Sequence, residues 1–104
     1  MTKKENEMME KNLKKITEHF GVDTELMKLS EEVGELQGIC YKELYDSLAN
    51  HIDDIEEECA DVLVVLLQIF LAFNVDMDKV VKTVEHKVDR TIKRIEEGWY
   101  DKHR

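Results

Sequence analysis

Residues 51–74 read HIDDIEEECADVLVVLLQIFLAFN, and this stretch decides the fold. Its apolar residues recur every three or four positions, which is the repeat of an α-helix that buries one face. They are Ile52, Ile55, Cys59, Val62, Leu66, Ile69 and Phe73. From Val62 to Phe73 the helix is apolar on most sides, and one short chain has limited means of covering so wide a surface. We therefore expect the chain to assemble as a homodimer or homotetramer.

Three further helices are predicted around this stretch. Residues 4–20, 24–45 and 76–97 carry the same periodic apolar pattern, and no strand pattern competes with it. Glycines act as stop signals after the first and fourth helices, and polar N-cap candidates precede the second and fourth. The glycines are Gly21 and Gly98, and the caps are Asp23 or Thr24, and Asp76. With a loop at residues 46–50, the sequence predicts one all-α domain over residues 1–104, a bundle of four to five helices.

Two acidic signatures occupy matching positions on the second and third predicted helices. They are Glu31-Glu32-x-x-Glu35 and Glu57-Glu58-x-x-Asp61, offset by 26 residues (58 − 32 and 61 − 35). Carboxylates three residues apart lie about 60° apart around a helix, on one face. If the two helices pack antiparallel, the pairs can converge, and four such charges repel unless a cation intervenes. Oxygen ligands select a hard divalent ion, so the pattern indicates a Mg²⁺ or Mn²⁺ enzyme acting on phosphates.

The composition narrows the class of protein. The 104 residues are 38% charged and 42% apolar with no proline, which is typical of a soluble helical domain. The net charge of −9 argues against nucleic-acid binding through a basic face. Cys40 and Cys59 do not form a disulfide pattern, and the N-terminus lacks an apolar signal segment, so we expect a cytoplasmic protein away from membranes.

The paired signatures resemble a known family. Lys28-x-x-Glu31-Glu32-x-x-Glu35-Leu36, followed by Glu57-Glu58-x-x-Asp61-Val62-Leu63, is similar to the MazG-type all-α nucleoside triphosphate pyrophosphohydrolases. The resemblance spans about residues 26–94, and only the two halves together are specific. It implies a MazG-like fold and hydrolysis of the α–β phosphoanhydride of a nucleoside triphosphate, which gives a monophosphate and pyrophosphate.

The resemblance also implies roles for the acidic residues. Glu32, Glu35, Glu58 and Asp61 would be the Mg²⁺ ligands, and Glu31 would help to position or deprotonate the attacking water. Basic residues should then balance the charge of the triphosphate. Lys87, Arg90 and Arg94 share one face of the fourth predicted helix, and Lys28 lies one turn before Glu31 and Glu32. These four cations are the expected substrate-binding residues, although each can also be an ordinary surface charge.

Two other functions remain open at this level. Phosphoribosyl-ATP pyrophosphohydrolase belongs to the same group of relatives, and the signatures do not separate it from an enzyme that acts on nucleoside triphosphates. A non-catalytic acidic helical protein that self-associates through its apolar stripes would have a similar sequence pattern. The base that the substrate carries is not indicated.

Overall fold

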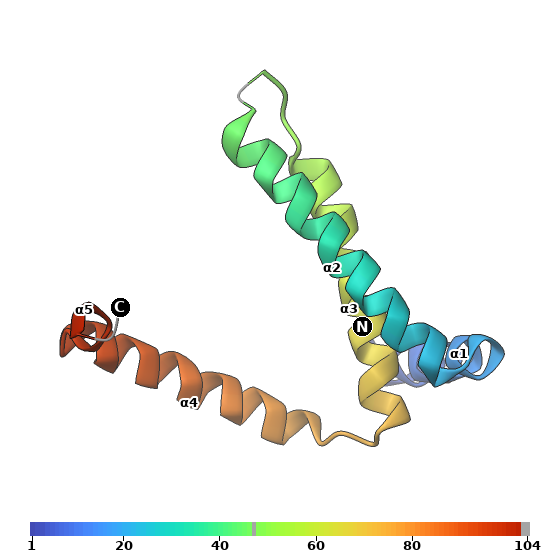
Figure 1. Cartoon of the computed structure of the whole chain (residues 1–104). Coiled ribbons are helices and arrows are strands. Elements are labelled where there is room, and N and C mark those ends of the chain that lie inside the picture. The colour runs from blue at the N-terminus through green and yellow to red at the C-terminus, as the bar shows by residue number, and fades with distance from the viewer. Residues whose placement is uncertain (47, 103–104) are drawn as a thin grey trace. The chain divides into compact units, whose positions relative to one another are not determined.

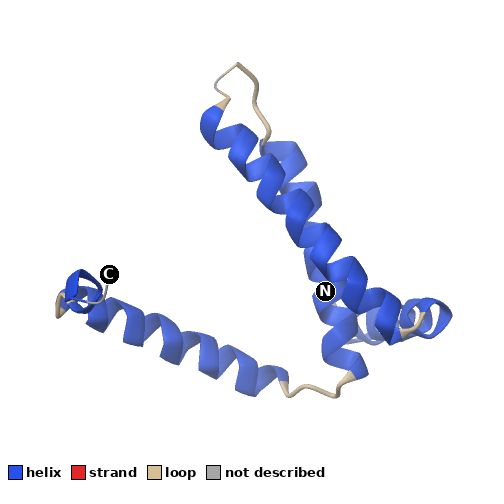
Figure 2. Ribbon diagram, in the orientation of Figure 1, coloured by secondary structure: helices blue, strands red, loops and turns tan. Residues whose placement is uncertain are grey.

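The computed structural model describes residues 1–46 and 48–102, and every regular element in these ranges is a helix (Figures 1 and 2). The helices are α1 (Lys3–Phe20), α2 (Val22–Tyr45), α3 (Ile52–Ala72), α4 (Met77–Glu96) and α5 (Trp99–Lys102). The all-α prediction is thus confirmed for the described residues. The chain divides into two compact units, Met1–Asn74 and Val75–Arg104. None of the described helices is both long enough and apolar enough to cross a bilayer.

A single residue, Gly21, joins α1 to α2. Its φ of 88° is a left-handed value that favours glycine, and its N–H bonds the Thr17 carbonyl at 2.7 Å, which closes α1. Gly21 is also the N-cap of α2. The prediction of Asp23 or Thr24 as this cap is wrong, because both residues already lie in the first turn of α2. There the negative charge of the Asp23 carboxylate still stabilises the helix, because it lies near the positive end of the helix dipole.

Residues 46–51 connect α2 to α3 and tie the two helix ends together. Glu43 Oε2 accepts a hydrogen bond of 2.7 Å from the His51 N–H. The His51 imidazole lies between the carboxylates of Asp46 (3.9 Å) and Asp54 (4.0 Å). These contacts fix where α3 begins relative to the end of α2, and therefore the register between the helices. The predicted loop at residues 46–50 is confirmed, except that Ser47 lies outside the described residues.

The interior of the first unit is partly polar. Its buried residues are Leu13, Thr17, Glu25, Val65 and Gln68. Gln68 Nε2 donates a 3.0 Å hydrogen bond to Thr17 Oγ1, which in turn donates to the Leu13 carbonyl at 3.0 Å. This chain of hydrogen bonds links α3 to α1 and satisfies polar groups that would otherwise be costly to bury.

The buried line of α3 is shifted by one residue from its apolar stripe. Val65 is 2% exposed, whereas the neighbouring stripe residue Leu66 is only half-buried. Steps of four and three residues back from Val65 lead to Asp61 and Glu58. The acidic residues of α3 therefore lie in line with its buried face. On α2 the stripe residues Leu29 and Leu36 are half-buried, whereas the stripe residue Val33 is 46% exposed, so only part of that stripe packs.

The second unit is built on α4. Asp76 caps this helix as predicted, since its Oδ1 accepts a 3.2 Å hydrogen bond from the Lys79 N–H. Gly98 follows α4 with a φ of 70°, which agrees with its predicted role as a stop signal. The Arg94 guanidinium then lies 4.8 Å from the Trp99 ring centroid and holds the start of α5 against the end of α4.

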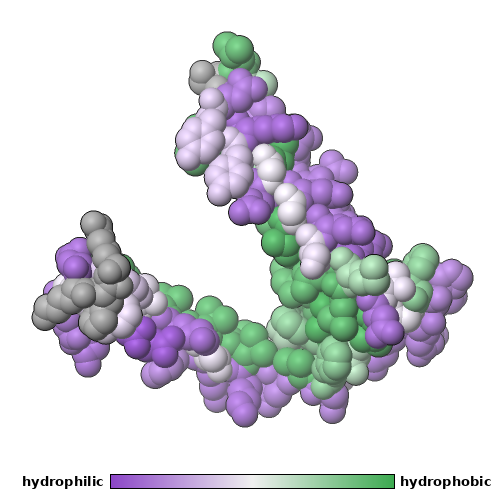
Figure 3. Space-filling model, in the orientation of Figure 1, coloured by the Kyte–Doolittle hydropathy of each residue, from purple (hydrophilic) through white to green (hydrophobic). Residues whose placement is uncertain are grey.

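Large apolar side chains remain exposed in both units (Figure 3). In the first unit Leu63 and Phe73 are 57% and 60% exposed. In the second unit, the apolar stripe of α4 is more than half exposed at Val84, Val88, Ile92 and Ile95. Assembly as a homodimer or homotetramer, which would cover such side chains, stays a prediction.

Candidate metal centre

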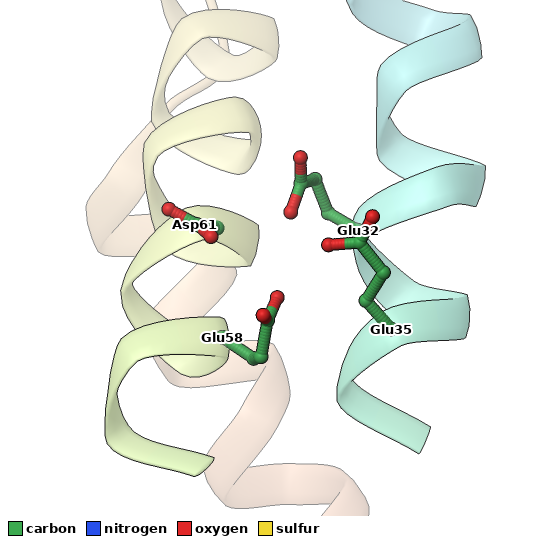
Figure 4. Close-up of side chains that lie close together, drawn as sticks. All are labelled: Glu32, Glu35, Glu58 and Asp61. Atoms are coloured by element: carbon green, nitrogen blue, oxygen red, sulfur yellow. The ribbon is translucent and has the colours of Figure 1, made fainter. Parts of the chain in front are cut away.

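Four carboxylates converge between α2 and α3 (Figure 4). Glu32 and Glu35 project from α2, and Glu58 and Asp61 project from α3 to meet them. Each residue offers one carboxylate oxygen, and these four atoms all lie within 4.8 Å of one another. The prediction that the two acidic signatures face each other is confirmed.

The convergence follows from antiparallel packing and from equal spacing within each pair. The contact between α2 and α3 is the most extensive between any two described helices. Because the chain reverses at residues 46–51, Glu32 lies level with Asp61 and Glu35 lies level with Glu58 (Figure 4). A spacing of three residues on each helix keeps both pairs level, so the four carboxylates form a compact group.

Two of these carboxyl groups hold a proton more strongly than usual. Burial raises the pKa of Glu32 above its ordinary value of 4.5, the charges of Glu35 and Asp61 raise it further, and Lys28 lowers it. Burial also raises the pKa of Glu58 above 4.5, and the charge of Glu35 is the next cause. The Oε2 atoms of Glu32 and Glu58 are enclosed and have no hydrogen-bond partner among the described residues. The group is therefore short of positive charge and of donors.

A hard divalent cation fits this set of oxygens. Opposite ligands around Mg²⁺ are about 4.2 Å apart, because each Mg–O bond is about 2.1 Å long. Oxygens within 4.8 Å of one another would need only small side-chain movements to reach that spacing. A cation would also supply a partner for the enclosed oxygens of Glu32 and Glu58. Glu32, Glu35, Glu58 and Asp61 can thus hold a metal ion.

Two further predicted site residues lie beside the group on α2. Glu31 is exposed and is not one of the four converging carboxylates. Lys28 is close enough to Glu32 to lower its pKa, and the Lys28 Nζ lies 5.8 Å from the centroid of the Phe20 ring. The structure therefore places a cation at the edge of the centre, while the roles of Lys28 and Glu31 toward a substrate stay predictions.

The remaining predicted substrate-binding residues belong to the second unit. Lys87 and Arg90 are exposed on α4, and Arg94 is half-buried against Trp99. The contact with Trp99 gives Arg94 a structural role at the junction of α4 and α5. The assignment of Lys87, Arg90 and Arg94 to the phosphates stays a prediction from the sequence.

Sequence reasoning missed the buried polar residues next to the centre. Glu25 lies seven residues before Glu32, and Gln68 lies seven residues after Asp61, so each shares a side of its helix with one of the four converging carboxylates. Each is 2% exposed or less. This spacing of seven residues was the signal in the sequence for their burial. It was passed over because a glutamate or glutamine in an amphipathic pattern is normally assigned to the solvent face.

Comparison with known proteins adds no family to this geometry. No protein-family model matches the chain. No match is found among curated proteins or among solved structures either. The MazG-type resemblance thus rests on the two sequence signatures alone.

Proposed function

We propose that this protein is a Mg²⁺-dependent nucleoside triphosphate pyrophosphohydrolase of the MazG type. The observation that carries the proposal is the convergence of Glu32, Glu35, Glu58 and Asp61 to within 4.8 Å. Four carboxylates so placed repel one another, and enzymes that act on phosphate esters and anhydrides use such groups to bind Mg²⁺. Mn²⁺ is the alternative ion for the same oxygens.

The four carboxylates would hold the ion, because they converge from both sides of the contact between α2 and α3. Mg²⁺, when bound, would neutralise the triphosphate oxygens and favour in-line attack by water on the α-phosphorus. Glu31, exposed and adjacent to Glu32, would accept a proton from the attacking water. The bond between the α-phosphorus and the oxygen that bridges it to the β-phosphorus would break, and its electron pair would leave with pyrophosphate.

Cations of the chain would complete the charge balance. An acidic centre alone repels a triphosphate, so positive side chains are needed on the substrate as well. Lys28 is proposed as one of them, because it lies close enough to Glu32 to lower the pKa of that carboxyl group. The resemblance also suggests Lys87, Arg90 and Arg94 as phosphate-binding cations, which would stabilise the negative charge that grows as pyrophosphate leaves.

The test is release of pyrophosphate by the full chain in Mg²⁺ from a panel of nucleoside triphosphates and phosphoribosyl-ATP. We expect monophosphate and pyrophosphate as products. Asp61→Asn should remove most of the activity, and Glu57→Gln is the matched control, because Glu57 is exposed and lies outside the four ligands. Orthophosphate with a diphosphate would contradict cleavage between the α- and β-phosphates. Hydrolysis of phosphoribosyl-ATP alone would assign the chain to that reaction.

If no substrate is hydrolysed, the response of the chain to Mg²⁺ decides whether it binds a metal at all. If the chain also fails to respond to Mg²⁺ in thermal unfolding, the non-catalytic interaction protein becomes the better description. That protein would use the exposed apolar stripe of α4 for self-association without binding a metal.

A further inference from the structure

Glu43 is turned toward the hairpin of α2 and α3, although the residues beside it are not. Glu43 is half-buried, whereas Leu44 and Tyr45 are 69% and 77% exposed. This is the reverse of the usual order, because a charged group loses water on burial and a large apolar side chain gains from it. The inward position of Glu43 therefore requires a partner for its carboxylate.

The partner of Glu43 is the start of α3. Glu43 Oε2 accepts a hydrogen bond of 2.7 Å from the backbone N–H of His51, which is the N-cap residue of α3. The His51 side chain makes no capping bond, so the first N–H groups of α3 find their acceptors elsewhere. Asn50 Oδ1 serves the Ile52 N–H at 2.9 Å, and Glu43 serves His51 from α2. The Glu43 carboxylate also brings negative charge to the positive end of the α3 dipole.

This hydrogen bond joins α2 directly to the start of α3. Among residues 1–46 and 48–102, no other side-chain hydrogen bond outside the carboxylate centre links these two helices. Apolar packing defines their register less strictly, since Leu29 and Leu36 are only half-buried and Val33 is 46% exposed. A bond between two defined atoms is directional, so it can fix a register that broad apolar faces leave open.

The carboxylate centre lies about two turns along both helices from this bond. Eight residues separate Glu35 from Glu43, which is about 12 Å along α2. Seven residues separate His51 from Glu58, which is about 10.5 Å along α3. The two arms of the hairpin are nearly equal in length, so a fixed end at Glu43 and His51 keeps Glu35 level with Glu58.

The centre depends on this register. A slip of one helical turn, about 5.4 Å, would leave only one residue of each acidic pair facing the other pair. If Glu35 came to lie opposite Asp61, for example, Glu32 and Glu58 would have no acidic residue at their level. Such a slip would relieve the repulsion among four oxygens that lie within 4.8 Å of one another. A contact outside the centre is therefore needed to oppose the slip.

We infer, on the basis of the metal ion in the proposed function, that Glu43 is a positioning residue for the carboxylate centre. It lies two turns from the proposed ligands and acts through the backbone. Its bond to the His51 N–H anchors the start of α3 against α2, and this anchor holds the carboxylates of α3 opposite those of α2. In the sequence Glu43 is one acidic residue among many, and its contact across the loop distinguishes it.

The test is the affinity of the full chain for Mg²⁺, measured by calorimetry well below the melting temperature. Circular dichroism at the same temperature confirms that each variant is folded, so a weaker affinity reports the centre rather than unfolding. We expect Glu43→Ala to raise the Kd for Mg²⁺ at least about tenfold, as for the loss of a group that orients metal ligands. Glu43→Gln keeps an oxygen acceptor of the same reach, so its Kd should stay within about threefold of the wild type.

The glutamine variant separates the hydrogen bond from a general effect of charge. Glu56→Ala is the matched control, because it removes an exposed carboxylate of α3 that makes none of these contacts, and its Kd should match the wild type. If Glu43→Ala does not fold, Glu43→Asp takes its place, since it keeps the charge but draws the acceptor back, and the same loss is expected. An unchanged Kd in Glu43→Ala, or in Glu43→Asp where that variant replaces it, would overturn the inference. Equal weakening in Glu43→Ala and Glu43→Gln would overturn it too.

The outcomes also separate this inference from the proposed function. Because the readout is metal affinity, a chain that binds Mg²⁺ without hydrolysing any nucleotide would still test the role of Glu43. If the wild type does not bind Mg²⁺, the proposed function fails, and the register is read in the metal-free chain. Nuclear Overhauser contacts between methyl groups of α2 and α3 report it. Glu43→Ala should shift or lose these contacts, and an unchanged pattern would overturn the positioning role.

Discussion

Replacing Glu35 by glutamine tests whether the four carboxylates act as one metal-binding group. Glu35 is exposed on α2, so an amide of the same shape can replace the carboxylate without disturbing the packing. Its charge is the leading charge effect that raises the pKa of both Glu32 and Glu58. Removing that charge should relieve repulsion, so we expect the metal-free variant to be at least as stable as the wild type.

The response to Mg²⁺ should change in the opposite direction. A ligand that binds only the folded state at 100 times its Kd stabilises that state by about 2.7 kcal/mol. For a chain of this size, each kcal/mol raises the melting temperature by about 4–8 °C, so the wild type should gain about 11–22 °C. If the loss of one of four charged ligands weakens affinity about 100-fold, the stabilisation at the same concentration falls to about 0.4 kcal/mol, or roughly 2–3 °C.

Thermal unfolding followed by circular dichroism at increasing Mg²⁺ measures both effects in one experiment. Glu57→Gln makes the same change in net charge next to the centre but outside the four ligands, so it should keep the wild-type response. The electrostatic reasoning is wrong if Glu35→Gln lowers the stability of the metal-free protein. The metal assignment is wrong if Glu35→Gln gains as much as the wild type from Mg²⁺.

Four other changes have defined outcomes. Because the pKa values of Glu32 and Glu58 are raised, the folded metal-free chain binds more protons than the unfolded chain. The stability of the metal-free protein should therefore fall as pH rises above 4.5. The affinity for Mg²⁺, measured by calorimetry, should rise over the same range. Gln68→Ala removes the link to Thr17 and leaves a cavity, which should cost about 2–3 kcal/mol in urea unfolding; a loss below about 0.5 kcal/mol would mean that the link is unimportant. Arg90→Ala should lower kcat for pyrophosphate release at least about tenfold and leave Mg²⁺ binding unchanged, whereas wild-type kinetics would make Arg90 an ordinary surface charge. Val88→Asp places a charge in the exposed stripe of α4 and should shift the protein toward monomer in sedimentation, unless the wild type is itself a monomer.

The helices were predictable because their signals are local. Glycine stop signals and the Asp76 cap depend only on neighbouring residues, and Gly21, Gly98 and Asp76 act as the sequence indicates. The start of α2 was misplaced because Gly21 serves both helices, ending α1 and capping α2 in one step. A pattern of side chains does not reveal that one residue does both.

The convergence of the four carboxylates was predictable for a different reason. An i, i+3 pair on each of two consecutive helices converges under antiparallel packing, and Glu32 and Asp61 meet as that geometry requires.

The interior was less predictable, because apolar periodicity identifies a broad face rather than a line of contact. Val65 is buried more deeply than its stripe neighbour Leu66. Glu25 shows the same limit, since its burial depends on which residues the opposite helix places at its level.

The arrangement of all four carboxylates on one helical hairpin has a kinetic consequence. The hairpin brings together residues that lie 23 and 29 positions apart (58 − 35 and 61 − 32), so they meet only when the loop between α2 and α3 closes. Its negative charge accumulates only as α2 and α3 close on each other, so electrostatic resistance develops late in that step. Dissolved salt screens this resistance over distances of about 10 Å at 0.1 M, and a divalent ion at the centre removes much more of it. Cations are therefore expected to speed closure of the hairpin and to stabilise its closed form.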